Sequence, residues 1–275
     1  MTSTWLITGA TSGFGRLVAE RALAAGAHVI AVGRRRDRLA ELADHATQGK
    51  LTTIEVDITA DGTEQFLADA VRTAGGLDVL VNNAGYGLFG SVEQIDAGKA
   101  RAIFETNVLA NLAVLRATLP ALRASRGRIV QMSSMNGQLA WASSGLYSAS
   151  KAAVELASEA LALELAPTGA KVTIVEPGVF ATEFATSLHV VAPDDAYAPT
   201  VGKFLTDFSA QPPSAFGDAE RVADAIMAVT AMEEPPLRLA VGADAVEGIR
   251  RSLRSRLAEL DRWESLLHAP VGEKV

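Results

Sequence analysis

Short apolar runs alternate along the chain with longer segments in which apolar residues recur every three to four positions. The short runs predict strands at Thr4–Thr8, His28–Val32, Leu51–Val56, Leu77–Val81, Arg128–Met132, Val172–Val175 and Leu237–Val241. The longer segments predict helices, among them Leu17–Ala25, Arg38–Ala46, Gln65–Ala74, Arg101–Leu122 and Ala149–Leu165. Strands that alternate with helices indicate parallel pairing, and nearly all-apolar strands are typical of a sheet covered on both faces. We therefore expect an α/β fold: a single domain over residues 1–275 with a doubly wound parallel sheet of about seven strands and helices on both faces.

Two segments do not follow this alternation. Residues 183–217 are expected to begin with a helix, to end in a loop around Pro212-Pro213, and to form a substrate lid. Residues 243–267 are expected to form a C-terminal helical extension, because apolar side chains recur there at helical spacing: Ile249, Leu253, Leu257, Leu260 and Leu267. We interpret the arginines of that extension as a solvated face, with a partner or anion site as the alternative.

Composition narrows the classes of function. The 275 residues are 49% hydrophobic, carry a net charge of −7 and include no cysteine. An acidic chain is unsuited to nucleic acid or to an anionic membrane surface, and without cysteine it has neither disulfides nor thiolate-bound metals. No apolar run approaches the ~20 residues that span a bilayer, and the first residues lack a signal-peptide pattern. We therefore expect a cytoplasmic protein that binds no nucleic acid, no membrane and no metal.

A glycine-rich turn directly follows the first predicted strand and leads into a helix. It reads Thr8-Gly9-Ala10-Thr11-Ser12-Gly13-Phe14-Gly15. Glycine lets the backbone approach a pyrophosphate closely, and free N–H groups at a helix start point toward the anion. The spacing of these glycines differs from the G-x-G-x-x-G fingerprint, and glycines also serve plain tight turns. The position in the first strand–helix unit is what favours a dinucleotide site.

Arginine follows the second strand, where the ribose of a dinucleotide would lie. The sequence there is Val32-Gly33-Arg34-Arg35-Arg36, and the first carboxylate is Asp37. An acidic residue at the strand end would bind a ribose 2′-hydroxyl, whereas arginine suits a 2′-phosphate. We expect NADP(H) rather than NAD(H), with Arg34 as the main contact and Arg35 as a second one. The alternative is a solvated basic helix start, which the helix dipole disfavours.

The candidate chemistry lies in Tyr147-Ser148-Ala149-Ser150-Lys151, which places Tyr147 and Lys151 on one face of a predicted helix. A tyrosine has a reference pKa of about 10, and a lysine ammonium nearby favours the phenolate and is expected to lower that pKa. Ser134, at the end of the fifth predicted strand, can hold a substrate oxygen beside the phenol. A single Tyr-x-x-x-Lys is usually a helix surface pair, so the assignment depends on the accompanying motifs.

Together these motifs resemble the short-chain dehydrogenase/reductase family in its compact, non-extended branch. Thr8–Gly15 matches TGxxxGxG, Asn82-Asn83-Ala84-Gly85 matches NNAG, and Ser134, Tyr147 and Lys151 stand at the family's spacing. Pro177-Gly178 with Thr182 follows the sixth strand. The resemblance covers about Thr4 to Val241 and implies a Rossmann-type NAD(P)-binding domain. The extension that follows is similar to a subgroup that resembles 17β-hydroxysteroid dehydrogenases.

The resemblance implies roles for further residues. Asn107 would complete a catalytic tetrad with Ser134, Tyr147 and Lys151 by holding a water in a proton relay, and Lys151 would also bind the nicotinamide ribose. Beyond the glycine turn and the arginines, the implied cofactor contacts are Asp57 and Ile58 at the adenine, Asn83 with Ala84 and Gly85 near the adenosine ribose, and Pro177, Gly178, Phe180 and Thr182 at the carboxamide. The family pairs through two long helices, which implies a homodimer or homotetramer.

The expected reaction transfers a hydride between the nicotinamide and a carbonyl or alcohol, with Tyr147 as general acid/base and Ser134 binding the oxygen. A largely apolar small molecule would lie against Tyr86, Leu88, Phe89, Leu139, Trp141, Phe184, Leu188, Tyr197, Phe204 and Phe208, although core packing is the ordinary role of such side chains. His189 is expected to be a surface or lid residue and not a catalyst.

Two alternatives stay open from the sequence. An epimerase or dehydratase of the extended branch would carry TGxxGxxG and a larger C-terminal domain, neither of which is found in this chain. A non-catalytic dinucleotide-binding sensor or scaffold of the same fold usually loses the tyrosine or the lysine. Retention of Ser134, Tyr147, Lys151 and Asn107 favours the enzyme.

Overall fold

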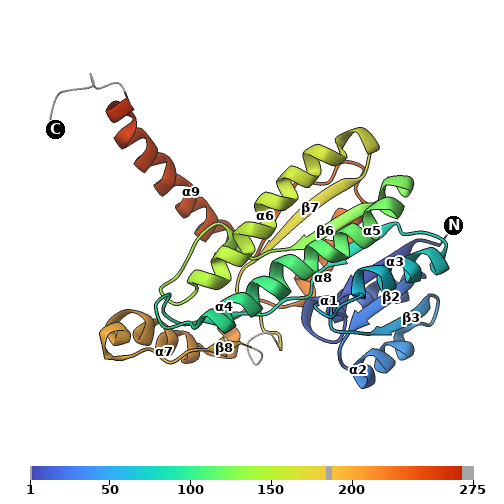
Figure 1. Cartoon of the computed structure of the whole chain (residues 1–275), viewed down its shortest axis with the longest axis horizontal. Coiled ribbons are helices and arrows are strands. Elements are labelled where there is room, and N and C mark those ends of the chain that lie inside the picture. The colour runs from blue at the N-terminus through green and yellow to red at the C-terminus, as the bar shows by residue number, and fades with distance from the viewer. Residues whose placement is uncertain (1, 184–187, 268–275) are drawn as a thin grey trace.

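A seven-stranded parallel sheet in the order β3-β2-β1-β4-β6-β7-β9 forms the centre of the molecule (Figure 1). The structure, a computed structural model, describes residues 2–183 and 188–267. The strands are β1 (Thr4–Thr8), β2 (His28–Gly33), β3 (Lys50–Glu55), β4 (Val79–Asn82), β6 (Arg128–Met132), β7 (Lys171–Pro177) and β9 (Arg238–Val241). All neighbours in this sheet pair in parallel. The predicted doubly wound parallel sheet is confirmed, with strand bounds that differ from the prediction by at most two residues.

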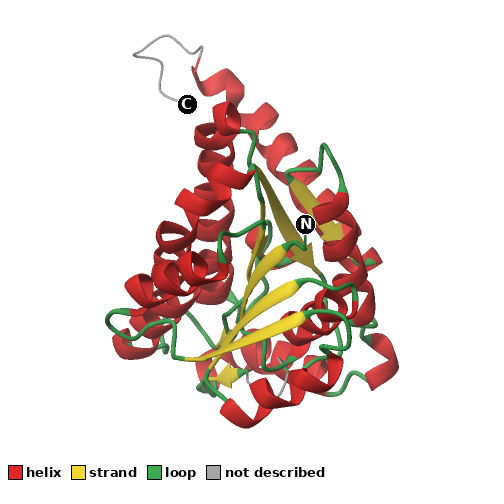
Figure 2. Ribbon diagram, turned by 90° about the vertical axis from the view of Figure 1, so that its right-hand side faces the viewer, coloured by secondary structure: helices red, strands yellow, loops and turns green. Residues whose placement is uncertain are grey.

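Helices cover both faces of the sheet (Figure 2). One face packs against α1 (Gly13–Ala24), α2 (Arg36–Ala40) and α8 (Glu220–Ala231), and the other against α3 (Thr63–Ala74), α5 (Asn111–Ser125) and α6 (Gly145–Leu165). Successive side chains of a strand point to opposite faces. Ile7 of β1 therefore packs in the first layer and Leu6 in the second, and both are fully buried.

The strand order places a crevice beside β1. From β1 the chain continues to β2 and β3 on one side, and then crosses to β4 on the other side of β1. Ligands of such sheets bind outside the carboxyl ends of the strands at the point where the order reverses. The glycine turn after β1 and Asn83, directly after β4, meet at this point.

Several helices differ from the sequence-based expectation. The segment expected as one helix, Arg38–Ala46, is a short α2 followed by the 3-10 helix η1 (Glu41–His45), and Arg101–Leu122 is divided into α4 (Ala97–Phe104), the π-helix η2 (Glu105–Ala110) and α5. Helix α8 was not among the predicted helices. Its apolar residues Val222, Ala223 and Ile226 are fully buried against the sheet, so α8 belongs to the core.

The expected secondary structure of residues 183–217 is partly wrong. Residues 184–187, where the helix was expected to begin, lie outside the described residues. The chain then forms β8 (His189–Val190), which pairs with β5 (Leu88–Phe89), and turns through η5 (Asp195–Tyr197) and η6 (Ala198–Gly202). The helix α7 (Lys203–Ser209) comes later, and η7 (Pro213–Ala215) follows it. Packing of aromatic side chains on Phe89 and Trp141 determines where this helix lies.

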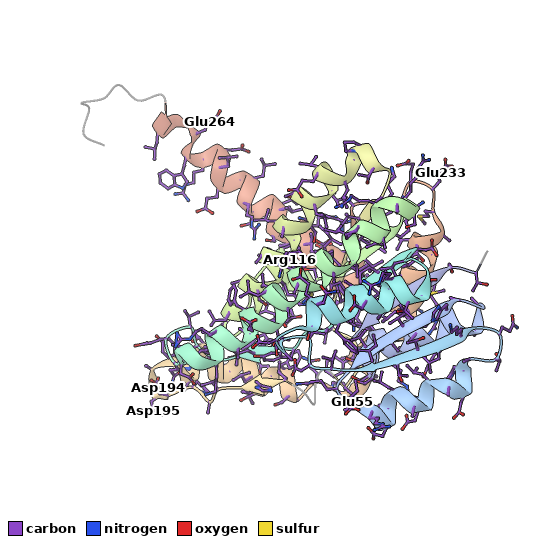
Figure 3. The ribbon with its side chains drawn as sticks, turned by 45° about the vertical axis from the view of Figure 1, so that its right-hand side comes forward. Glu55, Arg116, Asp194, Asp195, Glu233 and Glu264 are labelled. Carbon is purple, nitrogen blue, oxygen red and sulfur yellow. The ribbon has the colours of Figure 1, made fainter. Side chains whose placement is uncertain are left out.

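The predicted C-terminal helix is confirmed as α9 (Ala243–Trp263), followed by η8 (Glu264–Leu267). It leaves the body of the molecule, and Figure 3 places Glu264 at its outer end. Leu253, Leu257 and Leu260 along it are more than half exposed. Near its middle, Ser252 and Arg256 donate hydrogen bonds of 2.8 Å and 2.6 Å to the carbonyl oxygen of Gln138. The helix therefore contacts the domain at least as far as Arg256.

One helical stretch, residues 97–125, is by length and composition apolar enough to cross a membrane, the only such stretch in the part of the chain that the structure describes. The expectation that no apolar run reaches this length was therefore too strict. The stretch comprises α4, η2 and α5, and its residues Val114, Leu115 and Leu122 are buried against the sheet and α3. Packing in the α/β core accounts for its apolar character.

Candidate active site

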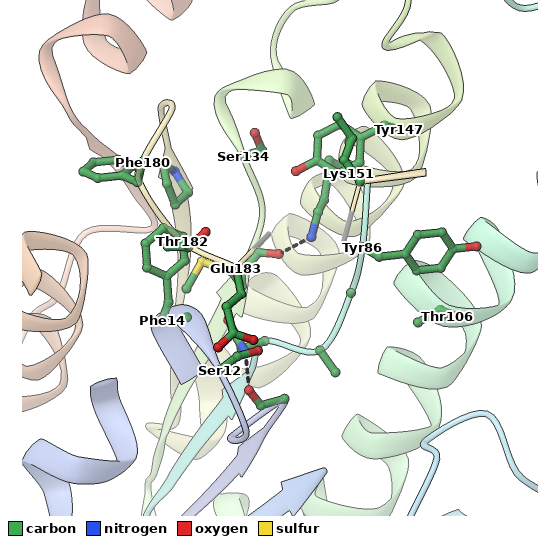
Figure 4. A pocket seen from close by; sticks show the side chains of 18 of the residues that line it. Ser12, Phe14, Tyr86, Thr106, Ser134, Tyr147, Lys151, Phe180, Thr182 and Glu183 are labelled. Atoms are coloured by element: carbon green, nitrogen blue, oxygen red, sulfur yellow. Dashed lines mark hydrogen bonds between the residues drawn. The ribbon is translucent and has the colours of Figure 1, made fainter. Parts of the chain in front are cut away.

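A cavity of about 690 Å³ lies at the carboxyl ends of β1, β2, β4, β6 and β7 (Figure 4). The structure brings most of the predicted cofactor residues together in its lining: Gly9, Thr11, Ser12, Gly13, Phe14, Arg34, Arg35, Asp57, Ile58, Asn83, Ala84, Gly85, Pro177, Gly178, Phe180 and Thr182. Ser134, Tyr147 and Lys151 line the same cavity. Gly15 and Asn107 do not line it and lie behind it.

The glycine turn is held open by its backbone and by Asn83. Gly9 has a φ of +68°, and a Cβ there would stand 2.7 Å from the Asn83 amide nitrogen. The same nitrogen donates a hydrogen bond of 2.9 Å to the carbonyl oxygen of Thr8. Ser12 begins α1 without a side-chain cap bond among the described residues, so the first N–H groups of the helix stay open toward the cavity. This cradle fits a pyrophosphate.

Gly15 has a packing role. A Cβ at this position would stand 2.5 Å from the Gly9 carbonyl oxygen and 2.5 Å from the Asn83 amide nitrogen. The first turn of α1 therefore packs directly against the glycine turn, and only glycine fits. The expected direct contact of Gly15 with a cofactor is not supported by its place outside the cavity lining.

The two arginines after β2 differ in their surroundings. Arg34 has a side chain that is 77% exposed, and its guanidinium lies 3.5 Å from the Asp57 carboxylate. Arg35 donates hydrogen bonds of 3.0 Å to the Thr11 carbonyl oxygen and 3.0 Å to the Glu183 carboxylate. Burial acts to raise the pKa of Asp57, but hydrogen bonds from Thr59 and the charge of Arg34 lower it overall. Arg34 is thus the arginine with more of its hydrogen-bonding capacity toward solvent.

The catalytic candidates come from two neighbouring elements. Ser134 follows β6 and caps the turn η3 (Met135–Gly137). Tyr147 and Lys151 lie one helical turn apart on α6, and all three residues are buried. Figure 4 shows the Ser134 and Tyr147 hydroxyls beside each other at one end of the pocket. The structure therefore brings these three side chains together, as expected from the sequence.

The electrostatics of the pair differ from the expectation. Burial raises the pKa of Tyr147 to about 12, and a hydrogen bond with Ser134 acts in the opposite direction. The expected lowering by Lys151 is not found, because the Lys151 Nζ lies 6.0 Å from the centre of the tyrosine ring and donates to the Met132 carbonyl oxygen. Burial lowers the pKa of Lys151 to about 8, and the charge of Glu155 opposes this. Loss of hydration disfavours the charged form of both groups.

Asn107 is fully buried in the π-helix η2, behind Gly85. Its Oδ1 accepts a hydrogen bond of 3.0 Å from the Tyr86 N–H, and its Nδ2 donates to the Tyr86 carbonyl oxygen at 2.9 Å and to Ser150 Oγ at 3.1 Å. The side chain thus braces the loop after β4 against α6. π-Helical turns often occur at functional sites. The Asn107 backbone carbonyl oxygen accepts a hydrogen bond of 2.8 Å from Asn111.

Aromatic side chains enclose the far end of the cavity. Of the expected wall residues, Tyr86, Phe89, Trp141, Leu188 and Phe208 line it, whereas Leu88, Leu139, Tyr197 and Phe204 do not. Phe184 lies outside the described residues. His189 lines the cavity from β8, with its ring centre 5.0 Å from that of Tyr86. Phe216, which the sequence analysis missed, contacts Phe208 at a ring-centre distance of 6.1 Å.

Sequence reasoning also missed a group of charges behind the site. Glu155, Glu176 and Arg238 meet there, with both carboxylates almost completely buried. The helical spacing of Glu155 from Tyr147 and Lys151 was the signal that could have revealed one member. Nothing in the sequence around Arg238 indicates that its side chain contacts Glu155 and Glu176.

The chain is similar to known proteins over most of its length. The family model of the short chain dehydrogenases matches residues 3–190. Oxidoreductase BOA17 of Botryotinia fuckeliana is 34% identical over 269 residues, which is 97% of this chain and 98% of that protein. A 3-ketodihydrosphingosine reductase of Bacteroides thetaiotaomicron is 33% identical over 86% of this chain and 87% of its own.

Solved structures agree with this similarity. A short-chain dehydrogenase from Streptomyces avermitilis matches with a TM-score of 0.88 and 40% identity, over 97% of this chain and 98% of its own. A short chain dehydrogenase from Burkholderia cenocepacia in complex with NADP has a TM-score of 0.75 and 28% identity, over 95% and 97% of the two chains. A short chain dehydrogenase/reductase from Burkholderia phymatum in complex with NAD has a TM-score of 0.81 and 25% identity, over 94% of this chain and 95% of its own.

Proposed function

Because the chain belongs to the short-chain dehydrogenase/reductase family, whose members are oxidoreductases acting on CH–OH and C=O groups of small molecules, we propose that it is an NADP(H)-dependent ketoreductase or secondary alcohol dehydrogenase for largely apolar substrates. The observation that carries the proposal is the meeting of Ser134, Tyr147 and Lys151 at one end of a cavity whose other end is the glycine turn.

The residues fit a nicotinamide dinucleotide. The open N–H groups of α1 and the close approach at Gly9 suit the pyrophosphate, and Asp57 and Ile58 line the side where an adenine would lie. Phe180 and Thr182 line the cavity after β7, beside Phe14 and Gly13, and would hold the carboxamide. The bound cofactor would supply or accept the hydride. The similar structures from the two Burkholderia species hold NADP and NAD, so the choice between them rests on this chain's own arginines.

Arg34 supports NADP(H). Its guanidinium is mostly exposed beside the cavity and can meet a 2′-phosphate with two parallel hydrogen bonds. Asp57 at 3.5 Å is its partner in this structure and competes with that phosphate. Arg35 already donates hydrogen bonds to Thr11 and Glu183, so we assign it the smaller contribution to binding of the 2′-phosphate.

For ketone reduction, the Ser134 and Tyr147 hydroxyls would both donate hydrogen bonds to the carbonyl oxygen. The raised pKa of Tyr147, about 12, keeps the phenol protonated at neutral pH, so it can give its proton to the oxygen as negative charge develops there. Lys151 would bind the nicotinamide ribose of the cofactor and place an ammonium charge near the phenol, and Asn107 would complete the tetrad, as the family resemblance implies. Oxidation of an alcohol is the reverse, with the phenolate as base.

The substrate class follows from the aromatic wall. The ring centre of Phe208 lies 6.2 Å from that of Phe89 and 6.5 Å from that of Trp141, and all three residues line the cavity. Charged side chains line mainly the cofactor end. Burying an apolar body there is favourable. The 3-ketodihydrosphingosine reductase among the similar proteins is named for a ketone of this general kind, which supports a ketone with an apolar body.

Residues 188–217 would act as a lid within the single domain. They reach the cavity through Leu188, His189, Phe208 and Phe216. Among the described residues, the segment attaches to the body by the two-residue strand pair β5–β8, by backbone hydrogen bonds of Gly217 with Val179 and Ala181, by bonds from Asp194 to Gln94 and from Tyr197 to Glu93, and by side-chain packing. Such a segment can open for substrate and close to exclude water.

A homodimer or homotetramer is the proposed assembly, in the cytoplasm. Leu156 and Leu163 of α6 are 66% and 79% exposed and lie on one face of the helix, as an interface between copies requires. Light scattering of Leu163→Glu, beside Leu253→Glu on α9, tests which helix carries the interface. The similarity to 17β-hydroxysteroid dehydrogenases stays a prediction.

The function is tested by the loss of NADPH absorbance with a panel of ketones, from acetone and cyclohexanone to 2-tetralone and a steroid ketone. The proposal expects turnover that increases with the apolar size of the ketone. A sensor or scaffold, the second candidate, would bind NADPH with no turnover of any ketone or of the matching alcohols with NADP⁺.

A further inference from the structure

A group of buried charges lies directly behind the site and takes no part in the chemistry above. Glu155 stands one helical turn beyond Lys151, so Tyr147, Lys151 and Glu155 share one face of α6. Its side chain is only 2% exposed. A carboxylate is seldom buried this completely unless hydrogen-bond donors satisfy it.

Glu155 accepts hydrogen bonds from both ends of the turn that carries Ser134. Its Oε1 accepts from Ser133 Oγ at 2.6 Å, directly before Ser134, and its Oε2 accepts from Gln138 Nε2 at 2.7 Å, directly after η3. Gly137 lies between these ties, and a Cβ there would stand 1.9 Å from Oε1. The turn therefore rests on the carboxylate with no space between them.

Arg238 balances the charge from the opposite side. Its guanidinium donates to Glu155 at 2.5 Å, to Glu176 at 2.6 Å and to Glu159 at 2.6 Å. The charged groups that face Glu155 are thus Lys151 and Glu159 on α6, Glu176 on β7 and Arg238 on β9. Burial and the charge of Glu176 raise the pKa of Glu155 above its ordinary value, and the hydrogen bonds from Ser133 and Arg238 oppose this increase.

We propose that Glu155 is a positioning residue that sets the Ser134 hydroxyl against the Tyr147 hydroxyl. The inference rests on the proposed function, in which these two hydroxyls bind the substrate oxygen. Tyr147 belongs to α6, whereas Ser134 follows β6, so the two hydroxyls move independently unless the elements are tied. Glu155 ties both ends of the serine turn to α6, and Ser148 ties its middle through Asn136 at 3.3 Å.

A glutamine at this position tests the role, because it keeps the size of the side chain. A carboxylate accepts at both oxygens, whereas an amide has one acceptor and one donor. In Glu155→Gln, an N–H₂ group against Gln138 Nε2 sets donor against donor and breaks that tie. An N–H₂ group against Ser133 forces the hydroxyl to turn from donor to acceptor, which replaces a bond to a charged carboxylate by a weaker neutral one. Either arrangement weakens one end of the turn. The hydrogen bond by which Ser134 lowers the pKa of Tyr147 weakens, so that pKa increases further.

Three measurements follow for wild type, Glu155→Gln and Glu159→Gln. In Glu155→Gln, kcat for NADPH-dependent reduction of 2-tetralone decreases by about ten- to a hundredfold, as small displacements of reacting groups do, while the NADPH Kd stays within about twofold. The pH limb of alcohol oxidation, which needs the phenolate, moves to higher pH. Amide exchange of residues 133–138, measured without substrate, becomes faster.

Glu159→Gln is the matched control, since it changes the same helix and the same arginine partner without touching the turn. It should leave all three measurements unchanged. Ser133→Ala removes the donor of the hydrogen bond between Ser133 and Glu155. Because the two residues act as one unit, the kcat of the double variant Ser133→Ala/Glu155→Gln should be no lower than that of the slower single variant.

A folded Glu155→Gln protein with wild-type kcat, pH limb and exchange overturns the positioning role. If circular dichroism shows that Glu155→Gln does not fold, Ser133→Ala decides the question by the same three measurements. Full activity of Tyr147→Phe would refute the proposed function instead. The exchange experiment needs no substrate, so it reports on the turn even in that case.

Discussion

The Nζ of Lys151 donates a hydrogen bond of 2.8 Å to the carbonyl oxygen of Met132, across the boundary between helix α6 and strand β6. Met132 lies two residues before Ser134, so this bond fixes the lysine beside the turn that presents the serine. The ammonium loses its hydration there, and burial lowers the pKa of Lys151 to about 8. This lysine therefore changes its charge near pH 8, within the pH range in which the enzyme can be assayed.

We predict that ketone reduction loses efficiency as Lys151 loses its proton. With saturating NADPH, kcat/KM should be level at neutral pH and decrease above about pH 8, the pKa of Lys151. The ammonium of any lysine loses its proton as pH increases, and the lowered pKa of Lys151 brings that loss down to about pH 8. Tyr147, with a pKa of about 12, stays protonated throughout this range. A profile that stays level to pH 10 would assign no role to the lysine charge.

Cofactor choice is predicted to depend on Arg34. A charge-assisted hydrogen bond contributes about 1.5–3 kcal/mol, so NADPH should exceed NADH by roughly ten- to a hundredfold in kcat/KM. Arg34→Ala should erase most of this preference by weakening NADPH, and Arg34→Asp should begin to favour NADH. Steady-state kinetics with both cofactors measures the ratio.

Arg36→Ala serves as the control for that series. Arg36 is exposed at the start of α2 and does not line the cavity, so its removal should leave the NADPH/NADH ratio unchanged. A wild type that prefers NADH, or an unchanged ratio in Arg34→Ala, would mean that these arginines are only a solvated helix start.

The turn against Glu155 should be sensitive to a single added carbon. In Gly137→Ala the Cβ would stand 1.9 Å from Glu155 Oε1, so the turn or the carboxylate must shift. We expect a loss of about 1–3 kcal/mol in the free energy of unfolding, the usual cost of overpacking. At Gly202 the nearest atom to a Cβ lies at 3.5 Å, so Gly202→Ala should cost little. Urea unfolding of both variants compares them, and equal stability would contradict the geometry.

The lid is predicted to carry substrate specificity. Phe208 reaches the cavity from α7, whereas Phe66 on α3 is 52% exposed and does not line it. Phe208→Ala should raise KM for a large apolar ketone several-fold and leave KM for acetone nearly unchanged, while Phe66→Ala changes neither. Amide exchange of residues 188–217 should be faster than in the sheet and slower once cofactor and ketone are bound. Exchange equal to that of the sheet with and without ligand would rule out a lid.

The sheet could be predicted from the sequence because each buried strand is a short apolar run between turn residues. β1 and β6 have the predicted bounds. The two-residue strands β5 and β8 were missed, because two residues carry no periodicity. The position of α7 could not be predicted either, since it depends on the packing of Phe204 and Phe208 against Phe89 and Trp141.

The candidate site, like the fold, could be predicted from the sequence only in part. Ser134, Tyr147, Lys151 and the glycine turn carry a fixed spacing that is visible in the sequence. Glu155 stands at helical spacing from Tyr147 and Lys151, but a charged residue within a helix predicts a solvated face. Its contact with Arg238, 83 residues later, shows that it is buried and satisfied. The raised pKa of Tyr147 likewise follows from burial, which residue spacing does not reveal.

Turnover by Tyr147→Phe is the measurement that tests the central claim most directly. Removal of one hydroxyl takes away the proton donor but leaves the cofactor cradle at Gly9 and Asn83 unchanged, so NADPH binding by fluorescence titration should be close to that of wild type. NADPH-dependent reduction of the ketone that wild type uses best should decrease by at least about a hundredfold, the usual contribution of a general acid. Activity within about tenfold of wild type, a barrier change of only ~1.4 kcal/mol, would remove Tyr147 from the role of acid/base.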